Sequence, residues 1–178
     1  MTTAQADSAT TFILRPATPD DCEALVRLIG ALAEYEQLTH LMQATPDALR
    51  TMLFGPRPVG EAVLAEVAGR AVGFALFFHN FSTFLCKPGL YLEDLFVEPA
   101  WRGHGIGKAL LVHLARLARE RDCGRFEWSV LDWNAPSIAF YEAMGADVLP
   151  DWRICRATGD ALAAMAALPM PDGVTRTD

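Results

Sequence analysis

Apolar side chains recur at helical spacing in two segments of the chain. One segment runs from residue 22 to residue 35, and the other begins near residue 106. Residues three or four positions apart lie on the same side of a helix, so this spacing predicts two amphipathic helices that each bury one face. The expected buried faces are Cys22, Leu25, Leu28, Ile29, Leu32 and Tyr35 in the first helix and Ile106, Leu110, Leu111, Leu114, Leu117 and Ala118 in the second.

Shorter apolar runs predict the strands of a sheet. Two of them, at residues 61–68 and 71–81, are separated by Gly69 and Arg70 and indicate a hairpin. Because some expected strands are joined by tight turns and others by helices, we expect one α/β domain with a single mixed sheet. The remaining expected strands are residues 11–15, 90–97, 126–131 and 152–157, with short helices at 46–55 and 135–144 and a loop at 82–89.

Length and charge narrow the classes of protein to consider. The chain has 178 residues, which suits one domain with a full core. Its formal net charge of −7 argues against a protein that holds nucleic acid or an anionic membrane by charge. The charge is uneven, because residues 101–125 carry six basic and two acidic side chains, +4 in total, which leaves −11 for the remainder. The acidic total therefore leaves room for a local basic site.

The chain is expected to consist of a disordered tail at residues 1–10, one domain at 11–160 and a C-terminal tail at 161–178. No run approaches the roughly 18 apolar residues that span a bilayer, and the first residues lack the basic and apolar regions of a secretion signal. We therefore expect a cytoplasmic protein with no membrane partner. The four cysteines form no Cys-x-x-Cys pair and the four histidines form no His-Glu-x-x-His pair, so no metal site is expected.

A glycine-rich stretch from Arg102 to Lys108 lies between an expected strand and an expected helix. Glycines let the backbone turn tightly and approach a ligand, and the start of a helix offers unpaired N–H groups, so the stretch suits a pyrophosphate. A P-loop is excluded, because Arg102 stands where the first glycine is needed and Ala109 stands where a hydroxyl residue is needed. A dinucleotide fingerprint is excluded as well, because the third glycine, Gly107, comes one position early.

Glu93 and Asp94 are neighbouring carboxylates inside an otherwise apolar strand. Neighbours in a regular strand face opposite sides of the sheet, so one of the two is expected to face a substrate unless a bulge intervenes. The pattern alone leaves open which of the two it is.

These two features belong to five blocks of sequence, Arg15–Thr18, Leu32–Glu36, Tyr91–Val97, Arg102–Gly107 and Trp133–Tyr141. In this order and spacing the blocks resemble the GCN5-related N-acetyltransferase (GNAT) family, and within it the diamine (spermidine/spermine) branch that includes thialysine acetyltransferases. The resemblance covers the expected domain. It implies the GNAT fold, acetyl-CoA as co-substrate, direct transfer of the acetyl group to a small amine in a ternary complex, and a homodimer.

The resemblance also implies roles for single residues. Glu93 matches a glutamate that contacts the substrate and is the first candidate base, with Asp94 the second. Tyr141 matches the general acid toward the CoA thiolate, and a phenol with a pKa near 10 is protonated at pH 7. Independently of the resemblance, Asn134 is expected to cap the helix that presents Tyr141. The expected CoA contacts are Leu95, Phe96, Val97, Arg102, Gly103, His104, Gly105, Ile106, Gly107, Lys108, Asn134, Pro136, Ser137 and Tyr141.

The expected amine contacts are acidic and aromatic, which suits a cationic substrate. The chain departs from the animal enzymes at residues 79–89, which lack their acidic, tryptophan-bearing loop and include Lys87. A zwitterionic amine such as thialysine therefore competes with a diamine or polyamine. A protein-lysine acetyltransferase and a non-catalytic CoA-binding module are the alternatives from other classes. The residues expected at the amine are Tyr35, Glu36, Glu93, Glu127, Trp128 and Ser129.

Overall fold

The computed structural model describes residues 11–171 of the chain. They form two compact units, which meet in the sequence between Ser129 and Val130. None of the described helices is long and apolar enough to cross a membrane. The first unit contains β1 (Ile13–Pro16), α1 (Cys22–Tyr35), α2 (Pro46–Phe54), β2 (Glu61–Val67), β3 (Arg70–Ser82), β4 (Lys87–Val97), α3 (Ile106–Glu120) and β5 (Arg125–Trp128), and the second contains α4 (Ala135–Ala143) and α5 (Gly159–Ala166).

The described strands form one mixed sheet in the order β1-β2-β3-β4-β5. Neighbours are antiparallel except β4 and β5, which are parallel. A parallel pair needs a long crossover connection, and α3 supplies it. Strands β2 and β3 are joined by a tight turn at Ala68 and Gly69, where Gly69 takes a left-handed φ of 79°. The predicted α/β fold with a single mixed sheet is confirmed.

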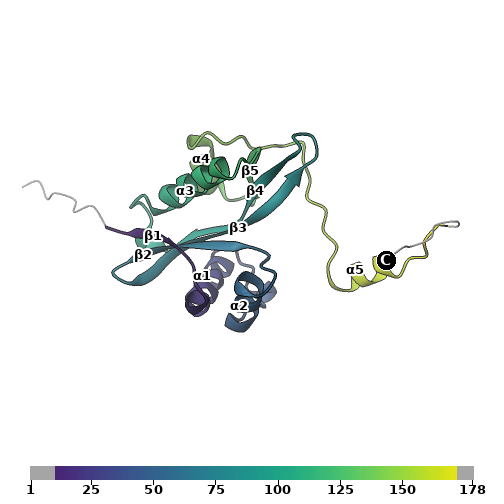
Figure 1. Ribbon diagram of the computed structural model, residues 1–178, viewed down its shortest axis with the longest axis horizontal. Coiled ribbons are helices and arrows are strands. Elements are labelled where there is room, and N and C mark those ends of the chain that lie inside the picture. The colour runs from purple at the N-terminus through teal and green to yellow at the C-terminus, as the bar shows by residue number, and fades with distance from the viewer. Residues whose placement is uncertain (1–10, 172–178) are drawn as a thin grey trace, which may run out of the picture. The chain divides into compact units, whose positions relative to one another are not determined.

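Helices cover both faces of this sheet. Figure 1 shows α1 and α2 on one side of the sheet and α3 on the other. On the α1 side, the fully buried Leu28, Leu64 and Phe74 belong to one continuous core. The opposite face of the sheet packs against α3, whose contacts with β3 and β4 are the most extensive that this helix makes. Two apolar layers therefore hold the sheet between its helices.

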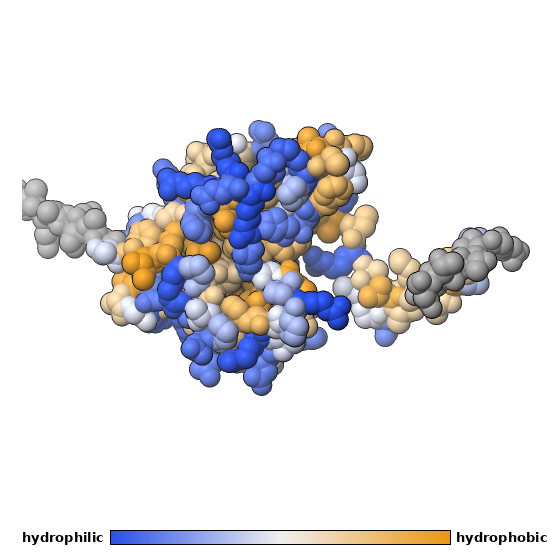
Figure 2. All heavy atoms as spheres, viewed as in Figure 1, coloured by the Kyte–Doolittle hydropathy of each residue, from blue (hydrophilic) through white to orange (hydrophobic). Residues whose placement is uncertain are grey.

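Helix α3 has the amphipathic character that its spacing predicts. Ile106, Leu110 and Leu114 are buried, whereas the charged Arg116 and Arg119 are exposed. Figure 2 shows hydrophilic side chains over this helix. Two charges of the basic segment noted in the sequence, Arg116 and Arg119, therefore lie on the outer side of α3.

A partly exposed pair of salt bridges joins α1 to the end of β4. Glu98, directly after β4, accepts from Arg70 at 2.7 Å and also pairs with Arg27 of α1. Arg27 in addition donates to the carbonyl of Ala71 at 2.6 Å. Although burial acts to raise it, the two guanidinium groups lower the pKa of Glu98 below its ordinary value. The strand that carries the predicted carboxylates is thus anchored at its end.

Most predicted elements are confirmed, with ends that move by a few residues. The helices expected at 22–35, 46–55 and 135–144 correspond to α1, α2 and α4. Strands β3 and β4 are longer than expected, so the predicted loop at 82–89 is reduced to a turn at 83–86. The disordered tail predicted at residues 1–10 lies outside the described residues.

The strand predicted at residues 152–157 is wrong for the described part of the chain. A strand needs a neighbour for its backbone hydrogen bonds, and this segment has no partner in the described sheet. Its apolar residues Trp152 and Ile154 are 77% and 69% exposed. The strand expected at 126–131 ends early, at Trp128, and the tail expected from residue 161 contains most of α5.

The core on the α1 side can be tested with Leu28→Ala. Leu28 is fully buried, so removing its side chain leaves a cavity and should lower the free energy of unfolding by about 2–5 kcal/mol. Urea unfolding measures this change. The matched control is Glu34→Ala, an exposed position on the same helix, which should change the stability by less than about 0.5 kcal/mol. Equal effects of the two variants would contradict the assignment of Leu28 to the core.

Candidate active site

Strand β4 carries a bulge at Glu93. Leu92 pairs with Phe77 of β3 and Asp94 pairs with Leu76, so Glu93 has no partner on β3. Paired residues share a face of the sheet, so Leu92 and Asp94 point to opposite faces although they are two residues apart. Leu76 packs against the core beneath α1. Asp94 therefore faces the α1 side, while Glu93 is exposed at the bulge.

Asp94 is surrounded by groups that disfavour its charge. Burial, followed by the nearby carboxylates of Glu93 and Glu36, raises the pKa of Asp94 to about 6. Glu36 follows the last residue of α1, and burial also raises its pKa above the ordinary value. Three of the predicted residues thus form one acidic group on the α1 side. A cation that entered this group would relieve the repulsion among the carboxylates.

The bulge also marks the point where β4 loses its other neighbour. The parallel ladder joins Gly89–Leu92 of β4 to Arg125–Trp128 of β5. Residues Glu93–Val97 continue beyond the last of these pairs, and of these Asp94–Val97 stay paired with β3 on one side only. The other backbone edge of this stretch lies outside the described sheet and is the part of β4 suited to pair with an extended ligand.

The glycine stretch turns from β4 into α3 through two left-handed residues. Gly103 and Gly105 both have a φ of 81°, and Gly105 is the N-cap of α3. No atom lies within 4 Å of where a side chain would begin at either glycine, so the requirement for glycine is conformational. The first N–H groups of a helix have no partner within it, and they bear the positive end of its dipole. With Lys108 in the first turn of α3, this donor set fits an anion.

Arg102 begins the stretch and points toward α1. Its guanidinium carbon lies 4.7 Å from the centre of the Tyr35 ring and 5.5 Å from that of Phe96. Its Nε donates to the carbonyl of Val97 at 3.0 Å. Of the predicted residues, Tyr35 at the amine side and Arg102 at the cofactor side are thus in direct contact.

The three residues predicted on β5 do not share one face. Glu127 pairs with Tyr91 and therefore faces the α1 side, and Ser129 shares a hydrogen bond of 2.8 Å with the Tyr91 hydroxyl. Trp128 pairs with Leu92 and faces the α3 side. Only Glu127 and Ser129 of the three lie on the same face as Asp94.

The charge of Glu127 is already compensated. Its Oε2 accepts from Nδ2 of Asn80 at 2.9 Å and lies 2.7 Å from Nε of Arg125, in an ion pair whose N–H is not aligned for a hydrogen bond. Asn80 and Arg125 approach each other across Gly89, where a side chain would collide with the Asn80 amide. This part of the face is therefore mixed in charge rather than acidic.

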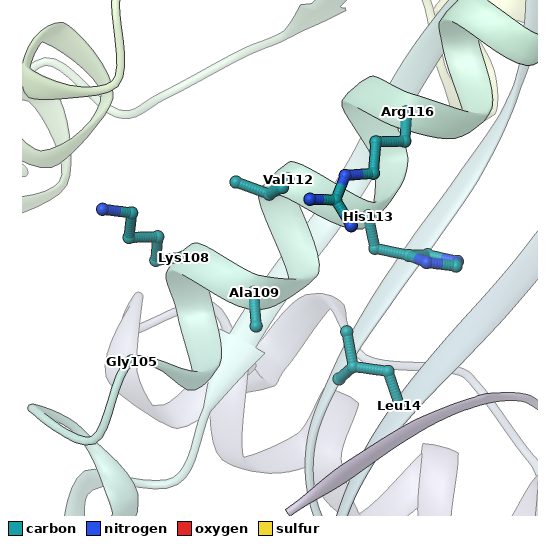
Figure 3. Close-up of a pocket in the computed structure, with 7 residues that line it drawn as sticks. All are labelled: Leu14, Gly105, Lys108, Ala109, Val112, His113 and Arg116. Carbon is teal, nitrogen blue, oxygen red and sulfur yellow. The ribbon is translucent and has the colours of Figure 1, made fainter.

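A shallow groove of about 410 Å³ lies along the outer flank of α3. Figure 3 shows Lys108 pointing away from His113 and Arg116, which lie nearer Leu14 of β1. The three basic groups do not converge on one point. We therefore assign the anion-binding character to the start of α3 and not to this groove.

The remaining predicted residues lie in the second unit. Asn134 is the N-cap of α4 and accepts from the N–H of Ser137, and Pro136 stands in the first turn, so the predicted cap is confirmed. Tyr141 lies on the same helix, partly buried, with its ring 5.3 Å from that of Phe140. The roles expected for these four residues toward CoA stay predictions.

Comparison with known proteins accounts for this arrangement. The model of the acetyltransferase (GNAT) family matches residues 25–146. The chain belongs to the GNAT acetyltransferase family. This GNAT protein is 36% identical to the L-ornithine N5-acetyltransferase NATA1 of Arabidopsis thaliana, over 87% of the chain and 88% of the relative. It is 33% identical to the thialysine N-epsilon-acetyltransferase of Bos taurus, over 86% and 96%. An integron cassette protein of V. cholerae shares its fold, with a TM-score of 0.76, 25% identity and coverage of 88% and 98%.

Membership of the family makes the protein an acetyl-CoA-dependent N-acetyltransferase. The described donors fit this co-substrate, because the unpaired helix start suits a pyrophosphate and the open edge of Glu93–Val97 suits an extended arm with amide groups. The predicted family and enzyme class are confirmed.

Sequence reasoning missed two polar residues of the α1-side face, Arg125 and Asn80. Arg125 could have been found, because it lies two positions before Glu127 in the same strand and so shares its face. Asn80 could not, since its contact depends on the register between β3 and β4 and on the absence of a side chain at Gly89.

The glycine loop can be tested with Gly105→Ala. Alanine at a left-handed φ costs roughly 1–2 kcal/mol, so the loop should shift and the affinity for CoA in calorimetry should fall at least tenfold. Gly69→Ala is the matched control, because Gly69 has a φ of 79° and open space around it but lies in the β2–β3 turn. Both variants should lose similar stability, and only Gly105→Ala should lose CoA affinity. Equal CoA affinities would contradict the assignment of the loop.

The environment of Asp94 predicts a pH-dependent gain of stability in Asp94→Asn. A raised pKa means that the folded protein binds a proton more tightly than the unfolded chain, so stability is lost as the pH rises from about 4 to about 6. Asparagine avoids this loss. The variant should be more stable than the wild type by ~2–3 kcal/mol above pH 6 and equally stable near pH 3. Thermal unfolding across pH measures the difference, and Glu34→Gln, an exposed position, should show none.

Proposed function

We propose that this N-acetyltransferase transfers the acetyl group of acetyl-CoA to the side-chain amine of a small zwitterionic or cationic substrate, by direct attack in a ternary complex. The observation that carries the proposal is the buried carboxylate of Asp94, grouped with Glu36 and Glu93 where β4 bulges. A group of this kind binds and deprotonates an ammonium. The two relatives named above carry ornithine and thialysine in their names, and both are amino acids with a side-chain amine.

The chemistry requires a neutral amine, because an ammonium has no lone pair for attack. The proton goes to a carboxylate, and the amine nitrogen then bonds to the thioester carbon while the carbon–sulfur bond breaks. Between the two predicted bases the raised pKa favours Asp94, since a base with a pKa of about 6 holds a proton better near neutral pH than an ordinary carboxylate. Glu93, exposed at the bulge, is the alternative base or the first contact of the amine. Tyr141 is proposed to give its proton to the departing thiolate, and the second proton that the attacking nitrogen loses restores the phenol.

The co-substrate is proposed to bind along β4 and across the glycine loop. The backbone of Leu95–Val97 would pair with the pantetheine arm, and Gly103–Lys108 would hold the pyrophosphate. Asn134, Pro136 and Ser137 are proposed to contact CoA from α4. A homodimer and a cytoplasmic location remain proposals that rest on the resemblance and on the sequence.

An amino acid suits the α1-side face better than a diamine or a polyamine. Glu127 is neutralised by Arg125, so only the neighbourhood of Asp94 remains acidic. Arg125, three residues before Trp128 in β5, offers a guanidinium to the α-carboxylate of a substrate whose side-chain amine reaches Asp94. A polyamine has no carboxylate for Arg125 and would meet only the compensated pair of Glu127 and Arg125 at this end. We therefore place ornithine-like and thialysine-like substrates ahead of polyamines.

Two matched pairs of amines test this preference. L-ornithine and putrescine differ only by a carboxyl group, as do L-lysine and cadaverine, and release of free thiol from acetyl-CoA reports transfer. We expect a kcat/KM at least about tenfold higher for each amino acid than for its diamine, and loss of this preference in Arg125→Gln. A preference of the wild type for diamines would contradict the proposal that the substrate is zwitterionic. Transfer only to a lysine-containing peptide would favour a protein acetyltransferase, and CoA binding without transfer would favour a binding module.

A further inference from the structure

Arg102 joins the two halves of the proposed site. Its guanidinium lies against the ring of Tyr35 at 4.7 Å, and Tyr35 ends α1 directly before Glu36 of the acidic group. On the other side, the backbone of Arg102 leads into Gly103 and the start of α3. The contact therefore spans from the proposed amine side to the proposed pyrophosphate side through a single residue.

Three separate interactions fix this guanidinium. It contacts the aromatic rings of Tyr35 and Phe96, and its Nε donates to the carbonyl of Val97 at 3.0 Å. The carbonyl of Arg102 is in turn 3.0 Å from Nδ1 of His104 within the loop. A planar guanidinium can lie on a ring and donate in its own plane at the same time, whereas the ammonium of lysine cannot. Arg102 thus holds the loop in place both through its side chain and through its backbone carbonyl.

The contact also changes what Tyr35 can do. A cationic amine was expected to lie against an aromatic face at this end of α1, but the structure has Arg102 on the Tyr35 ring. A second cation on the same face would meet the charge of the first. Tyr35 is therefore better suited to hold Arg102 than to hold the amine.

We propose that Arg102 is a positioning residue that couples α1 to the glycine loop, so that Tyr35 supports the binding of CoA although it lies at the amine side. The inference rests on the proposed function, in which the loop holds the pyrophosphate. It assigns Tyr35 a role toward the co-substrate and not toward the amine.

A double-mutant cycle between positions 35 and 102, with CoA affinity measured by calorimetry, tests the coupling. Tyr35→Leu should weaken CoA binding roughly three- to tenfold, because the ring that holds the guanidinium is lost. Arg102→Gln, which removes the cation from the ring, should weaken it by at least as much. In the double variant the loss should equal that of Arg102→Gln alone, because the proposed effect of Tyr35 on CoA passes through Arg102. Tyr35→Phe keeps the ring and should lose less CoA affinity than Tyr35→Leu.

The outcomes separate the inference from the proposed function. If the wild type fails to bind CoA, the proposed function fails. If the wild type binds CoA but Tyr35→Leu binds it equally well, or if the two losses multiply in the double variant, the coupling is overturned and the proposed function stands. Thermal unfolding of each variant shows whether it is folded. A Tyr35→Phe variant that is folded but binds CoA as weakly as Tyr35→Leu would also overturn the role of the ring.

Discussion

The pairing of β3 with β4 contains a bulge of one extra residue, Glu93 of β4, and the geometry of the site depends on this bulge. Because Glu93 has no partner, the alternation of side chains changes sides at this point, which turns Asp94 toward α1 while Leu92 faces α3. The pairing with β5 ends at the same place. One extra residue therefore aims a carboxylate at the point where the ladder to β5 ends and a backbone edge is open. None of these effects needs a special side chain, only an irregular register.

The acidic group and the positive start of α3 lie in different layers of the fold. Asp94 and Glu36 form an acidic group on the α1 side, whereas the positive start of α3 and Lys108 belong to the other layer. Placing two or three carboxylates together is costly, and the raised pKa of Asp94 is a direct expression of that cost. The repulsion among these carboxylates arises on the α1 side of β4. The salt bridges of Glu98 with Arg27 and Arg70 anchor the end of this strand to α1 and β3. The acidic and the positive parts of the proposed site thus come from different layers of the fold.

The sequence was informative where a local pattern decides the structure. The spacing of Leu25, Leu28 and Leu32 predicted α1, and the glycines at 103 and 105 predicted a turn that only glycine adopts easily. It was uninformative where register decides. The sequence pattern did not show whether Glu93 or Asp94 faces the substrate, because a bulge depends on how β3 and β4 pair.

The differences between these expectations and the structure have the same origin. Residues 152–157 alternate as a strand does, yet a strand exists only if a partner edge is available to it. The grouping of Glu127 with Trp128 followed sequence neighbours, although alternation sends them to opposite faces. The contact of Arg102 with Tyr35 joins residues far apart in the chain and had no local signal at all.

The unfavourable burial of Asp94 has a practical consequence for finding the substrate. A cation that settles beside this carboxylate removes part of the repulsion that the folded protein otherwise carries, so binding and stabilisation are linked. The protein can thus report its own ligand through its melting temperature, without acetyl-CoA and without turnover. The signal is largest where the carboxylate and the amine are both charged, which makes a buffer near neutral pH the condition in which a library of amines is best compared.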